Sequence, residues 1–478
     1  VTGVQTCALP ISCFPTASAL AATWNRDLIY QVGAAIGKES RAEKVGVVLG
    51  PGVNIKRSPL CGRNFEYFSE DPYLSGKIAA SHIKGMQDQG IGASLKHFAV
   101  NNQEYRRMTI DVIVDERALR EIYFAGFEIA VKESKPWTVM GAYNRVNGTY
   151  CCENSMLKNI LKGEWGYEGV VITDWGAMND CVTGLKAGTD LEMPGVPNGN
   201  QERIVAAVKD GQLAVSALDQ SVERILALIF KAEGLLEEGF ECDRGDHHDL
   251  ARTVAGEGAV LLKNERSILP LKKPTTIGLI GRFAKEPRYQ GAGSSLINPT
   301  RLDNLYDELI QFVGKEHILY ADGYPKLGES LEPSLVDEAL EVAKSVDVAI
   351  ICAGLPDMYE VEGVDRAHMK LPPGHNKLIE SIAKIKRDVV VVLSNGSPVE
   401  MPWVNDVPAV IEGYLGGQAG AGALADILYG VVNPSGKLAE TFPYTLEDTP
   451  TYHHFPGGPI TVEYRESIYV GYRYYDTV

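Results

Sequence analysis

Short apolar runs alternate with amphipathic stretches through the first half of the chain, and this alternation restricts the fold more than any other feature. The runs predict buried parallel strands at residues 45–55, 92–98, 137–143, 170–173 and 190–193. Apolar residues that recur every three or four positions predict helices between them, at 28–36, 74–87, 116–133, 156–162, 201–209 and 219–236. A β/α alternation of about 230 residues matches one (β/α)8 barrel, which we predict for residues 13–236.

Polar side chains stand at the carboxyl ends of these predicted strands. In a barrel such ends converge on one face, so the residues would gather in one pocket. Asp174, after the run VVIT, could attack or bind a ligand there, or simply cap the next helix. Trp175 could offer a flat face to a sugar ring or pack in the core. The strand-end residues are Asn54, Lys56, Lys96, His97, Tyr143, Asn144, Asp174, Trp175 and Glu192.

The second half repeats the alternation after a polar, glycine-containing linker at residues 237–250. Strands are predicted at 277–280, 348–352, 389–393 and 409–414, with helices at 334–346, 376–386 and 421–428. Ser216 with Asp219, and Ser334 with Asp337, suggest capping boxes. We therefore predict an α/β/α sandwich over residues 251–440, which places the whole chain in the α/β class.

Two loops of this second half carry candidate chemistry. QGAGSS, residues 290–295, is glycine-rich but lacks the glycine order and the lysine of a phosphate-binding loop, so a nucleotide site there is disfavoured. The loop at 354–366 contains Asp357, Glu360, Glu362 and Asp365. It is either a solvated acidic loop or the source of a proton donor that reaches over the barrel mouth.

Composition excludes several kinds of partner. The formal net charge of -16 argues against nucleic acid and anionic membranes, and no window approaches the roughly 20 apolar residues of a membrane span. The eight cysteines show no zinc-type spacing and no disulfide framework, which predicts a reducing cytoplasm. Residues 1–12 do not read as a signal peptide and resemble a translated sequencing adapter, so we expect an artefactual or disordered leader rather than a genuine N-terminal arm.

Four motifs together resemble glycoside hydrolase family 3, and in particular its bacterial β-glucosidases. They are KHFAVNNQEYRR (96–107), VMGAYNRVNG (139–148), VITDWGA (171–177) and YEVEGVDR (359–366). The resemblance extends from about residue 14 to the end of the chain. It implies a barrel followed by a sandwich, and retaining exo-hydrolysis of small-molecule or oligosaccharide β-glucosides without a metal or other cofactor.

The resemblance also implies a role for each matching residue. Asp174 would be the nucleophile and Glu362 the acid/base, with Glu360 as the second choice for the proton donor. Retaining hydrolysis needs such a pair of carboxyls, one ionised and one with a raised pKa. We expect cations and hydrogen-bond donors around Asp174, supplied by Lys96, His97, Arg63 and Arg107, to keep the pKa of the nucleophile low. We expect Glu360 and Asp365 to raise the pKa of Glu362. The sugar would contact Arg63, Lys96, His97, Arg107, Met140, Tyr143, Trp175 and Ser294.

Two departures from the family pattern concern the ends of the chain. The first barrel strand, with its D-G-P-x-G type motif, is not in the sequence. Residues 441–478 read as an extension toward a missing fibronectin-III-like domain. We therefore expect this fragment to be weak, unstable or inactive beside an N-terminally restored version.

Several functional alternatives stay open. FAVNNQE after Lys96-His97 disfavours the N-acetylglucosaminidases of the family, which carry KHFPGHG. A β-xylosidase or α-L-arabinofuranosidase of the same family, or a catalytically impaired sugar-binding fragment, fits the same motifs. The sequence leaves the question of a homo-oligomer open.

Overall fold

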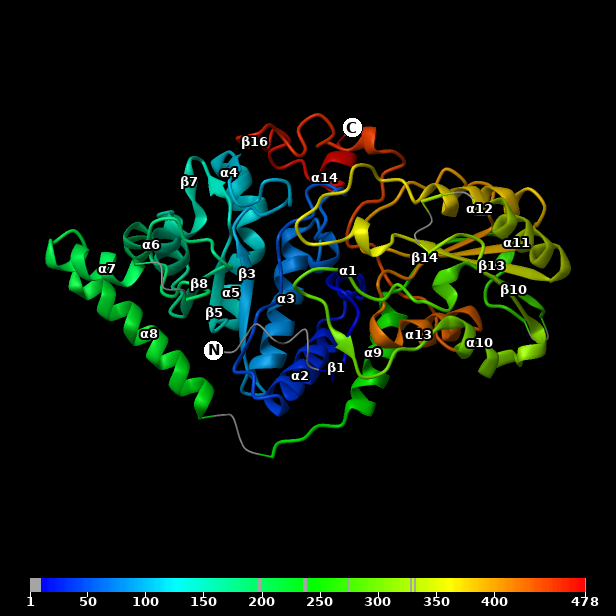
Figure 1. The fold of residues 1–478 in the computed structure, drawn as a ribbon, viewed down its shortest axis with the longest axis horizontal. Helices are drawn as coiled ribbons and strands as arrows, with labels where there is room; N and C mark the ends of the chain where they lie inside the picture. Colours follow the sequence, from blue (N-terminus) through cyan, green and yellow to red (C-terminus); the bar gives the residue numbers. More distant parts are fainter. Residues whose placement is uncertain are drawn as a thin grey trace.

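The computed structural model describes residues 10–195, 199–234, 239–272, 275–326, 329–330 and 332–477. It contains two α/β domains, and the C-terminal segment returns across the top of the first (Figure 1). Residues 1–9 of the predicted leader lie outside the described residues. Next to them, the short strand β1 (Pro10–Ile11) pairs in parallel with β11 (Asn298–Pro299) of the second domain.

The first domain is built on a parallel sheet in the order β2-β3-β5-β8. The strands are β2 (Val47–Val48), β3 (Gly92–Phe98), β5 (Thr138–Gly141) and β8 (Val170–Thr173). The predicted strands at 92–98 and 170–173 are thereby confirmed. The predicted 45–55 strand shortens to two residues because the Gly50-Pro51-Gly52 turn interrupts it.

The strand predicted at 190–193 is wrong, because Leu191 makes only an isolated bridge to Ile172. The carboxylate of Asp190 accepts the Val171 amide at 2.8 Å, so a side chain takes a place that a neighbouring strand's carbonyl would fill. Lys162 and Arg224 hold the same carboxylate at 2.7 and 3.1 Å. Asp190 therefore acts as a buried anchor beside β8.

Helices surround this sheet and begin largely where the sequence predicts. Asn25 caps α2 (Arg26–Ala42) by accepting the Leu28 amide, and α3 (Pro72–Gln87) packs on α2. The predicted 116–133 helix is divided into α4 (Glu116–Ala118), a π-helical stretch (Leu119–Tyr123) and α5 (Ala125–Ser134). The predicted 156–162 helix is a π-helix, Leu157–Glu164. The remaining helices are α1 (Ala17–Ala22), α6 (Cys181–Ala187), α7 (Asn200–Lys209) and α8 (Val215–Glu233).

Both predicted capping boxes are wrong, because each helix starts earlier than predicted. α8 begins at Val215 after Ala214, so Ser216 lies inside the helix. α11 (Pro333–Ser345) begins with a proline, which is favoured in the first helical turn, and Glu332 occupies the cap position without a side-chain hydrogen bond. The predicted linker is also shorter, since α9 (Arg244–Gly258) starts within it.

The second domain is a six-stranded sheet between two layers of helices (Figure 1). Its elements are β9 (Val260–Asn264), β10 (Ile277–Ile280), α10 (Leu305–Val313), β12 (Ile318–Ala321), β13 (Val348–Gly354), α12 (Pro373–Ala383), β14 (Val389–Ser394), β15 (Ala409–Glu412) and α13 (Gly420–Leu428). Side chains of β10 alternate between the two faces: Leu279 joins the core under α10 and α13, and Ile280 joins the core under α11 and α12. The edge strand β9 is antiparallel to β15, and the other neighbouring strands are parallel.

Residues 441–477, predicted as an extension, pack into the first domain. β16 (Thr461–Glu463) pairs with β4 (Asp111–Ile113) in a small sheet that continues to β6 (Arg145–Val146) and β7 (Thr149–Tyr150). Val462 and Tyr464 belong to the same apolar core as β3 and α5. The segment ends in α14 (Tyr472–Tyr475). The first domain is thus built from both ends of the chain.

Neither disulfides nor a membrane span were found in the described part of the chain. Every described cysteine is a free thiol, and Cys7 lies outside the described residues. Among the described helices, none combines the length and the apolar character that crossing a bilayer requires.

Candidate active site

Asp174 sits at the carboxyl end of β8, where the alternation of the first domain predicts it. Its amide donates to the Gly141 carbonyl at 3.1 Å, which continues the β5–β8 pairing by one residue. One carboxylate oxygen accepts the Trp175 amide at 2.7 Å, and the other lies 3.6 Å from His97 Nε2. The side chain keeps 13% of its surface exposed. Asp174 is therefore fixed by the backbone and open on one side.

Two neutral side chains flank Asp174. Burial, reinforced by the nearby cations Arg63 and Lys96, lowers the pKa of His97 well below its ordinary value, so the imidazole is neutral. Burial and the charge of Asp174 raise the pKa of Tyr143, whose hydroxyl hydrogen-bonds to Asp174. The tyrosine thus stays protonated and can donate to the carboxylate.

Glu362 is held by contacts from both domains. Arg107 of the first domain reaches it at 2.9 Å and Arg63 at 3.8 Å, and the Ser294 amide of the second domain donates to it at 2.8 Å. Burial acts to raise the pKa of Glu362, but Arg63, Ser294 and Arg107 outweigh it and bring the pKa to about 2. The predicted raised pKa is therefore wrong, and the side chain is ionised.

The carboxyls that were expected to raise this pKa make other contacts. Glu360 is buried and accepts the Gly396 amide at 2.7 Å and the Ser397 hydroxyl at 3.0 Å. Asp365 accepts the amides of Gly62, Glu104 and Tyr105 at 2.8–3.1 Å. Both side chains therefore anchor the loop, and Glu362 between them is the acid that faces Arg107.

The predicted cations also have partners that the sequence interpretation missed. Arg63 and Lys96 both contact Glu66, at 2.7 and 2.8 Å. Arg107 contacts Glu104 at 2.7 Å. In each arginine pair the glutamate is three residues away in the sequence, a spacing that could have indicated it. The cations thus divide their charge among several carboxylates instead of gathering around Asp174.

Arg107 and Tyr143 connect the two candidate catalytic carboxyls. The Arg107 guanidinium lies over the Tyr143 ring, 4.9 Å from its centre, while it also contacts Glu362. Tyr143 hydrogen-bonds to Asp174, and the charge of Glu362 also contributes to the raised pKa of its hydroxyl. Asp174 and Glu362 therefore line one site, approached from a strand end of the first domain and a loop of the second.

The remaining predicted residues border the same region. Met140 and Trp175 pack in one apolar cluster with Ile172 and Met193. Met140 is buried, whereas Trp175 is partly exposed. Ser294 is exposed on the glycine-rich loop and reaches Glu362 through its backbone amide. Two of the predicted residues are linked to the site less directly: Lys96 through Glu66, which Arg63 also contacts, and Met140 through the apolar cluster against which Trp175 packs.

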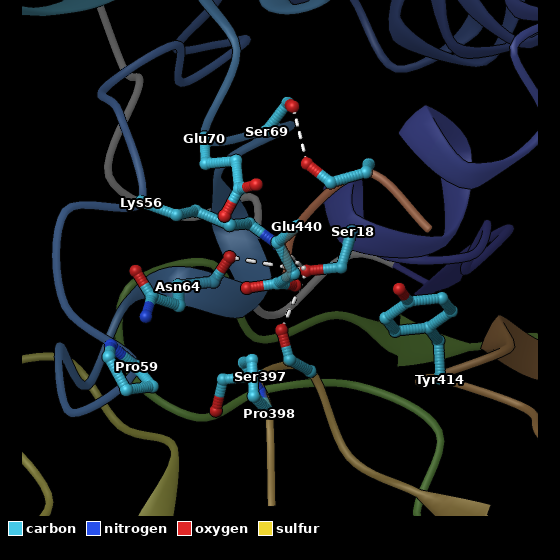
Figure 2. Close-up of polar contacts among 12 residues, drawn as sticks. Ser18, Lys56, Pro59, Asn64, Ser69, Glu70, Ser397, Pro398, Tyr414 and Glu440 are labelled. Carbon is cyan, nitrogen blue, oxygen red and sulfur yellow. Dashed lines mark hydrogen bonds and ion pairs between the residues drawn. The ribbon is translucent and has the colours of Figure 1, made fainter. Parts of the chain in front are cut away.

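A buried polar junction connects residues of the two domains (Figure 2). Lys56 Nζ lies 2.5 Å from Glu440 and 2.6 Å from the Ser18 hydroxyl, and both charged side chains are almost fully buried. Ser18 donates to the Gly396 carbonyl at 2.7 Å. The Gly396 amide in turn donates to Glu360, so the junction continues into the loop that carries Glu362.

No cluster of three or more histidine, cysteine, aspartate or glutamate side chains in the described residues is arranged to hold a metal ion. The chemistry available in the site is that of carboxyls, guanidinium groups, an ammonium group, an imidazole and a phenol.

The fold and the site define a two-domain α/β protein that pairs an aspartate from a barrel-like domain with a glutamate from an α/β sandwich. Family models agree: the Glycosyl hydrolase family 3 N terminal domain matches residues 1–228, and the Glycosyl hydrolase family 3 C-terminal domain matches residues 259–472. The chain belongs to glycosyl hydrolase family 3.

Among curated relatives, "Thermostable beta-glucosidase B" of Acetivibrio thermocellus is 58% identical over 98% of this chain and 62% of its own length. "Exo-alpha-(1->6)-L-arabinopyranosidase" of Bifidobacterium breve is 44% identical over 98% of this chain and 63% of its own length. The chain thus spans less than two thirds of the length of these relatives.

Solved structures show the same fold. A family 3 β-glucosidase from Bifidobacterium adolescentis superposes with a TM-score of 0.95 at 44% identity, covering 99% of this chain and 70% of the other. β-Glucosidase 3B from Thermotoga neapolitana, solved in complex with glucose, gives a TM-score of 0.89 at 40% identity, with 98% and 70% covered.

Proposed function

We propose that this chain carries the catalytic residues of a retaining, exo-acting β-glucosidase that removes terminal β-D-glucosyl residues. The observation that carries the proposal is the convergence of Asp174 and Glu362 on one site through Tyr143 and Arg107. The names of the Acetivibrio relative and of the glucose-bound Thermotoga structure support the glucoside as substrate.

In the proposed first step, an Asp174 oxygen attacks the anomeric carbon while Glu362 gives its proton to the departing glycosidic oxygen. The bond from the anomeric carbon to that oxygen breaks, and a covalent glycosyl–aspartate forms. In the second step Glu362 takes a proton from water, the hydroxide attacks the anomeric carbon, and Asp174 leaves as a carboxylate. Two inversions give net retention.

Proton donation requires that Glu362 first gain a proton, which its contacts with Arg107, Arg63 and Ser294 oppose. We infer that a bound sugar weakens these contacts by taking over the donors. Arg63 Nη1 is buried and has no hydrogen-bond partner within the described residues, so a sugar hydroxyl could satisfy it. Binding would thereby raise the pKa of Glu362.

The remaining pocket residues would hold the sugar. Lys96 and Arg107 would donate to hydroxyls, as would Arg63 and the neutral His97. Trp175 would lie against the apolar face of the ring, beside Met140. Tyr143 would keep Asp174 oriented toward the anomeric carbon, and Ser294 would face the sugar from the second domain.

A pentoside is the second candidate substrate, since two bifidobacterial relatives at 44% identity are named exo-α-(1→6)-L-arabinopyranosidases. A β-xylosidase or α-L-arabinofuranosidase activity belongs to the same alternative. The third candidate is a sugar-binding fragment with impaired catalysis.

A panel of aryl β-D-glucosides, β-D-xylosides and α-L-arabinosides separates these candidates. It should be run on the 478-residue chain and on a version extended to the length of the relatives, with Asp174→Ala and Glu362→Ala as controls. We expect the glucoside to be hydrolysed fastest and both variants to be inactive on it. Faster hydrolysis of a pentoside would contradict the assignment of a β-D-glucoside as the substrate. Glucose binding without hydrolysis in both versions would favour a sugar-binding fragment.

We also propose a cytoplasmic location, which the free thiols support. A homo-oligomer remains a hypothesis that light scattering on the purified chain would test.

A further inference from the structure

Glu104 is a buried carboxyl that is connected to the candidate acid Glu362 through two shared neighbours, Arg107 and Gly363. One of its oxygens, Oε2, accepts hydrogen bonds from two groups, Arg107 Nη1 at 2.7 Å and the Gly363 amide at 2.7 Å. Gly363 is the residue after Glu362, and the same Arg107 nitrogen lies 2.9 Å from Glu362. A single oxygen therefore contacts both the backbone that carries Glu362 and the cation that faces its side chain.

The contact between Glu104 and the loop is reciprocal. Glu104 accepts the amide of Gly363, and Asp365 from the same loop accepts the amides of Glu104 and Tyr105. Each segment thus supplies one carboxylate that accepts backbone amides of the other, one amide at Glu104 and two at Asp365. Such paired contacts fix the separation and the angle of two segments better than one contact does.

A buried carboxylate needs compensation, and this one has it only in part. Arg107 and Arg63 lie nearby as cations, and Asp365 as a further acid. Glu104 Oε1 has no hydrogen-bond partner within the described residues. Because a neutral apolar side chain would fill this space at lower cost, the carboxylate calls for a role beyond packing.

We propose that Glu104 is a positioning residue for the acid/base Glu362, which it orients through the Gly363 amide and through its share of Arg107. The proposal rests on the proposed function. Burial raises the pKa of Glu104 to about 7, so this carboxyl is largely ionised only above about pH 7. There it competes with Glu362 for Arg107, so Glu362 can take up its proton more readily. Without that competition Arg107 would pair fully with Glu362 and hold it ionised.

The variant Glu104→Gln tests this by its dependence on the leaving group. It keeps an oxygen for the Gly363 amide but loses the charge that holds Arg107. We expect kcat/KM for a phenyl β-glucoside, which needs a proton donor, to fall roughly 10- to 100-fold. Hydrolysis of a 2,4-dinitrophenyl β-glucoside, whose leaving group needs little protonation, should fall much less. In the pH profile of kcat/KM for the phenyl glucoside, the basic limb should also move to lower pH.

Glu70→Gln is the matched control. Glu70 is another buried carboxyl that accepts backbone amides, those of Thr441 and Tyr472. Among the described residues, none of its hydrogen bonds reaches the Glu362 loop. We expect Glu70→Gln to slow the hydrolysis of both glucosides by the same factor or not at all, and to leave the pH profile unchanged. The same pattern in Glu104→Gln would show a purely structural role and would overturn the proposal.

A second measurement decides the proposal if neither glucoside is hydrolysed, an outcome that counts against the proposed function itself. Hydrogen exchange of the peptide that contains residues 361–366 should be at least roughly fivefold faster in Glu104→Ala than in the unsubstituted chain and in Glu70→Ala. Unchanged exchange of this peptide would overturn the positioning role.

Discussion

Replacing Lys56 by methionine removes one charge from the junction between the domains and leaves the rest of the side chain close to its original size. Lys56 Nζ lies 2.5 Å from Glu440, and the two side chains are 2% and 3% exposed. The substitution therefore leaves the Glu440 carboxylate buried without its cation. Ser18 also loses the ammonium group that donates to it.

The expected loss of stability follows from the burial of the Lys56–Glu440 ion pair. Removing one partner of a buried ion pair typically costs about 3–5 kcal/mol, which lowers the Tm of a domain of this size by roughly 6–20 °C. Burial already raises the pKa of Glu440 to about 7, even though Lys56 opposes it. Without Lys56 that pKa rises further, so the unfavourable ionised form appears only as the pH increases. The stability lost in Lys56→Met should therefore be largest near pH 8 and smaller at about pH 5.

Differential scanning calorimetry of the unsubstituted chain and of Lys56→Met at the two pH values measures this. Lys77→Met is the matched control, since Lys77 pairs with Glu133 at 22% and 29% exposure, where a pair contributes about 0–1 kcal/mol. A loss in Lys56→Met no larger than in the control, or one that does not grow with pH, would refute the reasoning.

Three further predictions concern the site. Asp174→Asn should keep the fold by circular dichroism and lower kcat at least about 10⁴-fold on an activated aryl glucoside, and residual activity above that level would argue against a nucleophile. Because the pKa of Glu362 is lowered from 4.5 to about 2, its ionised form stabilises the fold above about pH 4.5, and this contribution is lost as the pH falls toward 2. The Tm of Glu362→Gln should accordingly lie below that of the unsubstituted chain near pH 6, and the gap should narrow toward about pH 3.5; a gap that widened would contradict the assigned contacts. Prolonged dialysis against EDTA should leave glucoside hydrolysis unchanged, whereas loss and recovery with an added divalent ion would reveal a metal requirement.

Strand positions were predictable because buried parallel strands are short, continuous apolar runs. The runs at 92–98, 170–173 and 277–280 form strands with those bounds. The failures occur where a side chain replaces backbone pairing, as Asp190 does beside β8. The antiparallel edge strand β9 was not predicted; its apolar residues Val260 to Leu262 are followed by the polar Lys263 and Asn264, which the strand also includes.

The residues of the site were predictable from motifs, but their charge pairing was not. Lys96 and Arg107 were expected near Asp174, yet Glu66 and Glu104 hold them. The low pKa of Glu362 depends on Arg63 and on the Ser294 amide, which come from distant parts of the chain. Only the folded arrangement determines which of several neighbouring carboxylates a cation contacts.

Trapping the covalent intermediate is the most direct test of the central claim that Asp174 attacks the sugar while Glu362 acts on the leaving oxygen. The chain, in its 478-residue and extended versions, is incubated with 2-deoxy-2-fluoro-β-glucosyl fluoride and digested, and the peptides are identified by mass spectrometry. We predict one fluoroglucosyl adduct, on Asp174, that is absent in Asp174→Asn. An adduct on Glu362 or on any other residue, or turnover of aryl glucosides without an adduct, would contradict the account.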